Sequence, residues 1–342
     1  MKFAIIGAGN TGVAMAGHLT TLNQQFRLYD RNKQKVEKIK KEGIVLKGVL
    51  EVETDVEITD DIEFAIEGAD YIMVMTTANG HREIGEQLAK YVTDSQVILI
   101  FNGNWGAVEI KEELKKAGKD KIVIAETGAQ IYISAHIEPG QAELMTIKKA
   151  IDIASIPSDA VDRITEELKD IYPQFNAVSN VLETSINNSN PTYHLPIVLF
   201  NAARIDAKQP FKFYGEGASE KVVRYTEKID EERMKICDNL GIKGVRALDI
   251  INSFWDVKHD NIYDTMHLNP VYNKGYAPLT FEHRYLSEDL PYGIGSLVKL
   301  AHKYDLEVPY LENLVTSLSL FLGRDFLEIG PDFKNFSVED YL

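Results

Sequence analysis

The sequence predicts an α/β protein in which a doubly wound, mostly parallel sheet is followed by a mainly α-helical domain. In the first half of the 342 residues, short apolar runs alternate with amphipathic segments, the pattern of strands joined by crossover helices. A glycine-rich turn follows the first apolar run. Beyond about residue 180, apolar residues recur every three or four positions, which is the helical period. We therefore expect two domains, residues 1–180 and 181–342.

The first domain begins with a strand and then alternates. We expect strands at Phe3–Ile6, Phe26–Tyr29, Tyr71–Met75, Val97–Phe101, Ile122–Ala125 and Phe175–Val178. We expect helices at Thr11–Leu22, Lys33–Lys41, Asp61–Ile66, Glu83–Tyr91, Val108–Ala117 and Ala160–Ile171. Residues 45–58 and 131–153 are typical of further extended segments. The segment Tyr71–Met75 is apolar throughout, as in a strand that is covered on both faces.

The second domain carries five segments with a helical period. They are Pro191–Ile205, Glu220–Leu240, Val245–Phe254, Ile294–Tyr304 and Tyr310–Leu322. Residues 283–293 place charged side chains, a proline and a glycine close together just before one of these helices. We expect this stretch to be a loop.

Composition excludes several classes of protein. The chain has 37 Lys and Arg against 52 Asp and Glu, a formal net charge of −15, which argues against a surface for nucleic acid or for anionic membranes. No apolar stretch reaches the ~18–20 residues that cross a bilayer. Cys237 is the only cysteine, so we expect no disulfide, no metal site and a reducing, cytoplasmic compartment. The sequence leaves a homodimer open.

Residues 7–12 spell Gly-Ala-Gly-Asn-Thr-Gly, a Gly-x-Gly-x-x-Gly motif between a predicted strand and a predicted helix. Gly7 permits the tight turn, Gly9 lets the backbone approach a pyrophosphate, and Gly12 lets helix and strand pack closely. The start of the helix adds unpaired N–H groups and a partial positive charge. This context predicts a dinucleotide-binding Rossmann domain.

Asp30 ends the second predicted strand, where a carboxylate accepts hydrogen bonds from the adenosine ribose and repels a 2′-phosphate. We therefore expect NAD(H), while Arg31 beside it leaves NADP(H) open as the alternative. Thr76, Asn102 and Asn104 follow later strands and lie where a doubly wound sheet presents groups to its ligand. The cofactor-binding residues that we expect are Gly7, Gly9, Asn10, Thr11, Gly12, Asp30, Arg31 and Thr76.

A second set of polar residues lies at the start of the segment 191–205. Asn190 is a candidate N-cap and Pro191 a favourable first helical residue. His194 lies in the first turn and Asn201 seven residues later on the same face. Pro196 removes a helical donor, so we expect a kink that turns the helix start toward a ligand.

Three motifs together resemble the opine dehydrogenase family, which includes octopine dehydrogenase. They are GAGNTG at the amino terminus, NPTYHLP at Asn190–Pro196 and RYLSEDLPYG at Arg284–Gly293. The 95 residues between His194 and Asp289 are similar to the spacing of the family's His–Asp pair. The resemblance covers nearly the whole chain. The glycine motif is shared by many dehydrogenases, whereas the other two motifs in this order are more specific.

The resemblance implies a Rossmann domain followed by a helical domain like the carboxy-terminal domain of 6-phosphogluconate dehydrogenases. It implies reductive condensation of an α-keto acid, often pyruvate, with an amino acid through an imine, driven by NAD(P)H. His194 would be the general acid and base, Asp289 its orienting carboxylate, and Arg284 the group that binds a substrate carboxylate. Asn104 and Asn201 are further candidates for substrate binding. Imidazole and guanidinium suit these two tasks chemically.

Two other functions remain open at this stage. A ketopantoate or 2-hydroxyacid reductase would share the two-domain frame, but such enzymes typically use a lysine at the start of the second domain, and no lysine lies between Leu182 and Lys208. A non-catalytic dinucleotide sensor would need no proton-transfer group. The set of His194, Arg284 and Asp289 counts against it.

Overall fold

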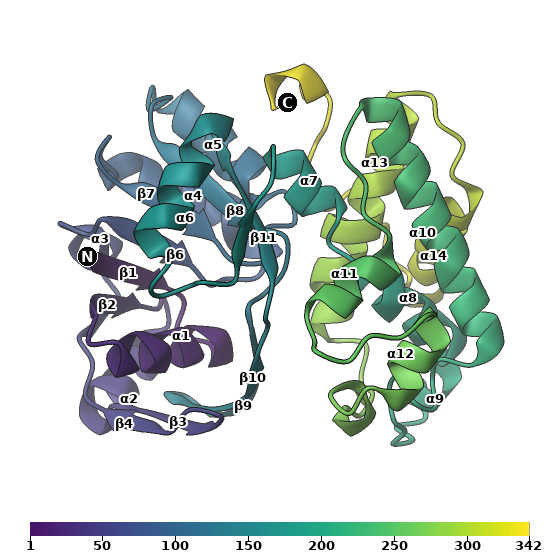
Figure 1. Cartoon of the computed structure of the whole chain (residues 1–342), viewed down its shortest axis with the longest axis horizontal. Helices are drawn as coiled ribbons and strands as arrows, with labels where there is room; N and C mark the ends of the chain where they lie inside the picture. The colour runs from purple at the N-terminus through teal and green to yellow at the C-terminus, as the bar shows by residue number, and fades with distance from the viewer. Residues whose placement is uncertain (342) are drawn as a thin grey trace. The chain divides into compact units, whose positions relative to one another are not determined.

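The structure is a computed structural model that describes residues 1–341. The chain divides into two compact units, residues 1–184 together with Tyr341, and residues 185–340 (Figure 1). The break falls inside helix α7 (Val181–Ile186). Within the described residues, no helix combines the length and apolarity that a bilayer crossing needs.

An eight-stranded sheet forms the centre of the first unit. Its strands are β1 (Lys2–Ile6), β2 (Gln25–Tyr29), β5 (Ile58–Thr59), β6 (Tyr71–Val74), β7 (Val97–Ile100), β8 (Val123–Thr127), β11 (Ile151–Ile156) and β12 (Phe175–Ala177). Their order is β12-β11-β8-β7-β6-β1-β2-β5, and only the β8–β11 pair is antiparallel. The chain thus winds outward in both directions from β1, as predicted, so the ligand crevice of such a sheet lies at the carboxyl ends of β1 and β6.

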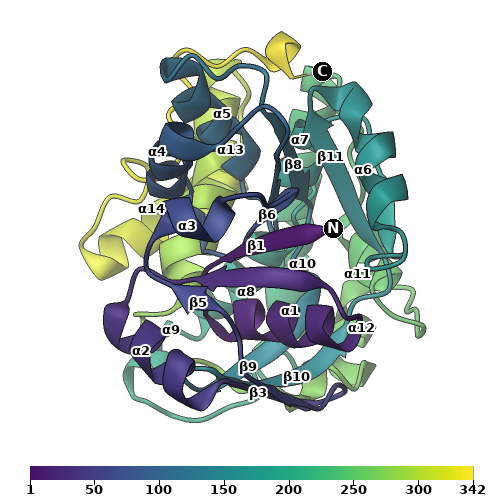
Figure 2. The same cartoon turned by 90° about the vertical axis from the view of Figure 1, so that its left-hand side faces the viewer.

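The helices of this unit are α1 (Asn10–Thr21), α2 (Lys33–Glu42), α3 (Ile62–Ile66), α4 (His81–Tyr91), α5 (Gly106–Lys116) and α6 (Val161–Leu168). Helices α3, α4 and α5 pack side by side, while α1 lies against the opposite side of the sheet (Figure 2). Strands β1, β6 and β7 are buried almost throughout, which explains their uninterrupted apolar sequences.

A second, smaller sheet covers the outer side of α1, and the sequence did not reveal it as a separate sheet. It consists of β3 (Ile44–Gly48), β4 (Val52–Thr54), β9 (Tyr132–Glu138) and β10 (Gln141–Ile147), in the order β4-β3-β10-β9 (Figure 2). Helix α1 is therefore buried on both sides. Gly17 makes this packing close, because a Cβ there would lie 2.6 Å from a methyl carbon of Leu46.

The second unit is helical, as predicted. Its helices after α7 are α8 (Asn190–Phe200), α9 (Ala202–Asp206), α10 (Glu220–Leu240), α11 (Ala247–Ser253), α12 (Ile262–Leu268), α13 (Gly295–Lys303) and α14 (Pro309–Leu322). Helix α8 is buried from Pro191 to Val198 and packs against α10 and α14. The helix begins one residue earlier than the N-cap assignment predicted, because Ser189 is the N-cap and Asn190 is already helical.

The expectation of a loop at residues 283–293 is wrong. Residues Tyr285–Ile294 form a π-helix that leads directly into α13. Pro291 lies inside it and has no N–H to donate, so the regular α-helical ladder is interrupted there. The charged composition suggested a solvated loop, yet Glu288 and Asp289 are buried. Gly293 lets the segment pack closely against α8, since a Cβ there would lie 2.3 Å from a ring carbon of Pro191.

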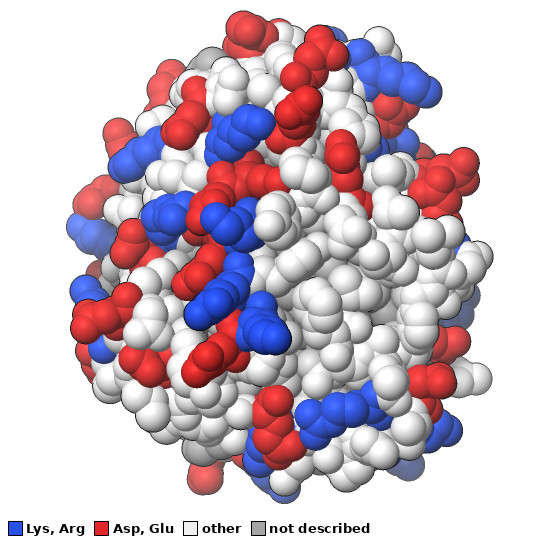
Figure 3. All heavy atoms as spheres, turned by 90° about the vertical axis from the view of Figure 1, so that its right-hand side faces the viewer, with Lys and Arg blue, Asp and Glu red and all other residues white. Residues whose placement is uncertain are grey.

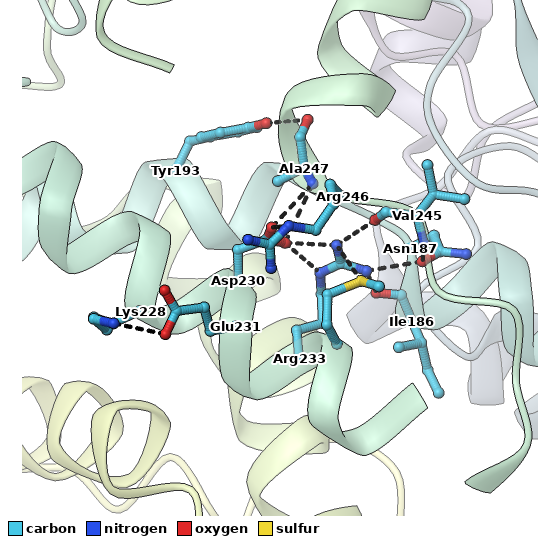
Figure 4. A network of polar contacts seen from close by, with 11 residues as sticks. Ile186, Asn187, Tyr193, Lys228, Asp230, Glu231, Arg233, Val245, Arg246 and Ala247 are labelled. Carbon is cyan, nitrogen blue, oxygen red and sulfur yellow. Dashed lines mark hydrogen bonds and ion pairs between the residues drawn. The ribbon is translucent and has the colours of Figure 1, made fainter. Parts of the chain in front are cut away.

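A buried ion-pair network stabilises the second unit next to α8 (Figure 4). Arg233 of α10 is fully buried and donates to Asp230 at 2.6 Å and to the side chain of Asn187 at 2.8 Å. Asp230 also accepts from the backbone N–H of Ala247 at 3.2 Å, and Tyr193 of α8 donates to the carbonyl of Ala247. The network therefore fixes α10, the end of α7 and the residue next to His194 relative to one another.

We predict that Arg233→Met lowers the free energy of unfolding by about 3 kcal/mol or more, because it leaves the Asp230 carboxylate buried without its main partner. Urea unfolding followed by circular dichroism measures this. Lys228→Met is the matched control, since Lys228 forms a 2.7 Å ion pair with Glu231 on the same helix but is half-exposed, and we expect a change below about 0.5 kcal/mol. Equal effects of the two substitutions would contradict the structural role of the network.

Candidate functional site

The glycine motif forms the turn between β1 and α1, and its three glycines differ in how much room each leaves for a side chain. Gly7 has φ +113°, a conformation that side chains with a Cβ rarely adopt. A Cβ on Gly12 would lie 1.8 Å from the carbonyl oxygen of Gly7, so helix and strand meet there without room for a side chain. A Cβ on Gly9 would meet nothing within 4 Å. The turn is therefore closed at Gly7 and Gly12 and open in front of Gly9.

Asp30 is the buried carboxylate at the end of β2. One of its oxygens accepts from the N–H of Ala8 at 3.0 Å and from the ammonium of Lys35 at 2.6 Å, and the other accepts from the N–H of Asn32 at 2.9 Å. The carboxylate thus holds the glycine turn directly. Lys35 is a partner that sequence reading missed, although its position one turn into α2 places it beside the strand end.

Arg31 and Thr76 flank this turn differently. Arg31 is largely exposed and pairs with Glu83 at 2.8 Å. Thr76 follows β6, and its methyl carbon would lie 3.4 Å from a Cβ built on Gly7. Its hydroxyl oxygen is buried and has no hydrogen-bond partner among the described residues.

Asn10 and Thr11 open α1. The Asn10 amide donates to the carbonyl oxygen of Ser134 at 2.7 Å, so this side chain attaches α1 to β9 of the small sheet. Thr11 is half-buried in the first turn. No side chain caps α1, which leaves its first N–H groups available to a ligand.

These features fit the pyrophosphate of a dinucleotide. The open space at Gly9, the uncapped start of α1 and the unpaired hydroxyl of Thr76 are what such a ligand needs in a doubly wound sheet. Among residues 1–341 no group of three or more His, Cys, Asp or Glu side chains is arranged to hold a metal ion.

The turn after β7 is strained. Asn102, Asn104 and Trp105 have φ values of +64°, +44° and +70°, which residues other than glycine rarely adopt. Glu126 of β8 holds this turn, because its buried carboxylate accepts from the N–H of Ala107 at 2.8 Å. Asn104 is only 1% exposed and lies at the carboxyl edge of the sheet. Glu126 was not singled out in the sequence, since a carboxylate at a strand end usually faces solvent.

His81 begins α4 and is fully buried beside this turn. A Cβ on Gly106 would lie 2.4 Å from its ring nitrogen Nδ1, so the ring packs closely against the start of α5. Burial lowers the pKa of His81 to about 4. The ring is therefore neutral near pH 7.

His194 and Asp289 form the centre of the site in the second unit. His194 Nδ1 lies 2.6 Å from an Asp289 carboxylate oxygen, and the side chains are 4% and 1% exposed. The structure thus brings together the two residues that the sequence paired across 95 positions. The second Asp289 oxygen is buried without a hydrogen-bond partner among the described residues.

The other ring nitrogen of His194 faces an unexpected partner. His194 Nε2 lies 2.8 Å from the hydroxyl oxygen of Tyr214. Tyr285 packs against the imidazole with ring centroids 4.1 Å apart and ring planes tilted by 32°, and Phe213 flanks it at 5.9 Å. Tyr214 had no signal in the sequence, because aromatic residues in a helical domain usually belong to its core. Tyr285 belongs to the RYLSEDLPYG motif, but nothing in that motif marks it as a neighbour of His194.

Arg284 immediately precedes the π-helix. Its guanidinium lies 3.7 Å from a carboxylate oxygen of Glu288, and its side chain is 45% exposed. Burial, together with the positive charge of Arg284, lowers the pKa of His283 to about 4. Arg284 is thus the one cation of the RYLSEDLPYG motif, and part of its side chain is open to solvent.

Asn201 occupies a different place. Its amide donates to the carbonyl oxygens of Ile197 and Gly217 at 2.9 and 3.0 Å, which closes the end of α8. Seven residues of helix separate it from His194, about 10 Å along the axis. The structure therefore brings His194 and Asp289 into contact, with Arg284 just before the π-helix that carries Asp289. The amide nitrogen of Asn201 is engaged at the end of α8, while its side-chain oxygen accepts from Arg204 at 3.4 Å.

Comparisons with known proteins cover both units. Residues 177–322 match the family "NAD/NADP octopine/nopaline dehydrogenase, alpha-helical domain", and residues 3–158 match the family "Ketopantoate reductase PanE/ApbA". An opine dehydrogenase from Arthrobacter sp. (strain 1C) is 28% identical over 332 residues, which cover 96% of this chain and 92% of that protein.

Solved structures share the fold. Octopine dehydrogenase with NADH and agmatine has a TM-score of 0.77 at 19% identity, covering 94% of this chain and 90% of that one. Yersinopine dehydrogenase with NADP⁺ bound has a TM-score of 0.76 at 15% identity, covering 96% of this chain and 91% of that one.

The resemblance to opine dehydrogenases that the three sequence motifs indicated is confirmed by these matches. Over nearly its whole length the chain is similar to opine dehydrogenases, and these relatives indicate an NAD(P)-dependent oxidoreductase.

Proposed function

We propose that the protein catalyses the reductive condensation of an α-keto acid with the amino group of an amino acid through an imine. The observation that carries this proposal is the buried His194–Asp289 pair at 2.6 Å, with Arg284 five residues before Asp289. Octopine dehydrogenase, a structural relative at 19% identity, has been solved with NADH and pyruvate. Pyruvate is therefore the keto acid that we favour.

Each group has a task in this reaction. Asp289 accepts from His194 Nδ1, which fixes the ring and stabilises its protonated form. Nε2 is the ring nitrogen whose proton goes to the oxygen that leaves during imine formation. Arg284 binds the keto-acid carboxylate through its forked N–H groups. Asn104 and Asn201 are the further substrate contacts that we propose. When bound, the reduced nicotinamide supplies the hydride.

The two domains divide the work in this proposal. Residues 1–180 form the dinucleotide-binding domain, supported by the open glycine turn, and residues 181–342 form the substrate domain, supported by the His194–Asp289 pair. Gly7, Gly9, Asn10, Thr11, Gly12, Asp30, Arg31 and Thr76 contribute to the cofactor site. A cytoplasmic location is supported only by the single cysteine, Cys237, which is buried and free.

A simple ketopantoate-like reductase is the second candidate, because the first unit matches that family over residues 3–158. The absence of lysine between Leu182 and Lys208 favours the opine reaction over it.

We predict that NAD(P)H oxidation in the presence of pyruvate depends on an added amino acid. The measurement follows absorbance at 340 nm with a panel of amino acids and without any. His194→Ala should lower turnover at least ~100-fold and leave NADH binding intact, measured by fluorescence, because it removes only proton transfer. His302→Ala is the matched control, since His302 is an exposed histidine of α13.

Oxidation that needs no amine would favour the simple reductase. Tight NADH binding without oxidation by any substrate pair would favour the sensor. Full turnover of His194→Ala would remove the proposed role of His194.

Our cofactor proposal is a preference for NAD(H), supported by the buried carboxylate of Asp30 at the end of β2. Lys35 at 2.6 Å offsets part of its charge, which keeps NADP(H) as the alternative. Both cofactors occur among the structural relatives.

We predict that Asp30→Asn weakens NADH binding about tenfold and shifts the preference toward NADPH, because it removes a charged acceptor and a repulsive charge together. Fluorescence titration with both cofactors measures the two Kd values. Asp60→Asn is the control, since Asp60 pairs with Lys33 nearby. A wild-type preference for NADPH, or an unchanged ratio in Asp30→Asn, would contradict the proposal.

A homodimer is our proposal for the assembly, supported by an uncharged face of the second unit. Helix α14 carries no charged residue from Asn313 to Leu322, and its side chains Leu320 and Phe321 are 79% and 52% exposed. Figure 3 shows a broad area without Lys, Arg, Asp or Glu on one half of this face, beside a half where both signs mix. Exposed apolar side chains that lie together, such as Leu320 and Phe321, often mark interfaces.

We predict that the protein is a dimer in light scattering and that Leu320→Glu makes it a monomer with unchanged circular dichroism. The charge would be buried without a partner in the interface. Leu268→Glu on α12 is the control, since Leu268 is 62% exposed. A monomeric wild type, or dimers of both variants, would refute the α14 interface.

A further inference from the structure

The hydroxyl of Tyr214 blocks direct access to the base. His194 is only 3% exposed, its Nδ1 is engaged by Asp289, and its Nε2 lies 2.8 Å from the Tyr214 oxygen. A substrate oxygen therefore reaches Nε2 in one of two ways. It displaces the Tyr214 side chain, or it binds to the Tyr214 hydroxyl and exchanges protons through it.

The surroundings of Tyr214 oppose displacement. Its ring packs edge-on against Tyr272 at 4.8 Å and against Phe213 at 5.0 Å. Its backbone carbonyl accepts from Ala218 at 3.0 Å, and the neighbouring Phe213 donates to Gly275 at 3.0 Å. The Tyr214 ring is thus in contact with aromatic rings on two sides. Hydrogen bonds of Phe213 and of the Tyr214 carbonyl fix the backbone on either side of its Cα.

The chemistry of the phenol suits a relay. A hydroxyl donates one hydrogen bond and accepts two, so it can accept a proton on one side while it releases one on the other. Burial raises the pKa of Tyr214 well above 10, so the group remains a neutral phenol throughout the working pH range. It therefore carries protons without itself being ionised.

We infer that Tyr214 is the proton relay between His194 and the substrate oxygen, an inference that rests on the proposed opine reaction. In imine formation, protonated His194 releases its Nε2 proton to the Tyr214 oxygen while the Tyr214 hydroxyl proton passes to the carbinolamine oxygen. The C–O bond breaks, water leaves, and the nitrogen lone pair forms the C=N bond. His194 ends neutral and Tyr214 unchanged, so the protons balance.

Several groups around Tyr214 influence how it titrates. Tyr285, Arg284 and Asp289 face it from the π-helix, Tyr272 from the segment Tyr272–Lys274, and His194 from α8. His283 lies beside Tyr285, with ring centroids 4.3 Å apart, and is neutral near pH 7 because of its lowered pKa. Tyr214→Phe changes one hydroxyl and leaves all of these charges in place.

The test compares Tyr214→Phe with Tyr272→Phe. Both remove one buried hydroxyl and keep the ring, but the Tyr272 oxygen accepts from Trp255 at 3.0 Å and does not contact His194. We expect Tyr214→Phe to lower kcat at least ~10-fold with an unchanged KM for NADH. We expect the proton inventory in mixed H₂O and D₂O, curved in the wild type because two protons move, to become linear in this variant. Tyr272→Phe should retain both properties of the wild type.

A rate for Tyr214→Phe equal to or above that of the wild type would overturn the relay and identify Tyr214 as a gate. An equal loss of kcat in both variants would contradict the relay and show that the Tyr214 hydroxyl contributes only to packing. Titration of His194 by ¹⁵N NMR separates this inference from the proposed function, because it needs no turnover. An Nε2 shift that is the same in the wild type and in Tyr214→Phe would refute the contact even if no substrate pair is consumed.

Discussion

The buried hydrogen bond between His194 and Asp289 is the constraint on which the second unit depends. It joins two segments that are 95 residues apart, and both are shaped to make it. Helix α8 is buried along most of its length, so an imidazole on it has no water to bind. The π-helix places Asp289 against it, and Gly293 lets the two segments approach until Pro191 rests on the backbone.

The first unit has to bind the anionic pyrophosphate of a dinucleotide although the protein has a net charge of −15. It does so with backbone groups rather than with a basic surface. The glycine turn leaves N–H groups free, and Asp30 fixes the turn by accepting from Ala8 at 3.0 Å. Glu126 likewise fixes the strained turn at Asn102–Trp105 by accepting from the N–H of Ala107 at 2.8 Å. Acidic residues here orient backbone donors, so negative charge and anion binding are compatible.

Much of this arrangement follows from the sequence, and the remainder has identifiable physical reasons. The doubly wound sheet and the helical domain were predictable because apolar periodicity and the glycine motif are local signals. The His194–Asp289 pair was predictable only through resemblance, because no local rule joins distant residues. Tyr214 was missed because aromatic residues in a helical domain usually belong to its core, and no local pattern marks a hydrogen bond to His194. The π-helix was missed because burial of Glu288 and Asp289 depends on tertiary packing.

The three glycines of the turn are under different kinds of constraint. A side chain at Gly7 or Gly12 conflicts with the backbone itself, so a substitution there destabilises the fold. A side chain at Gly9 would enter open space and conflict only with a ligand. A substitution at Gly9 is therefore expected to prevent cofactor binding while the protein keeps its fold.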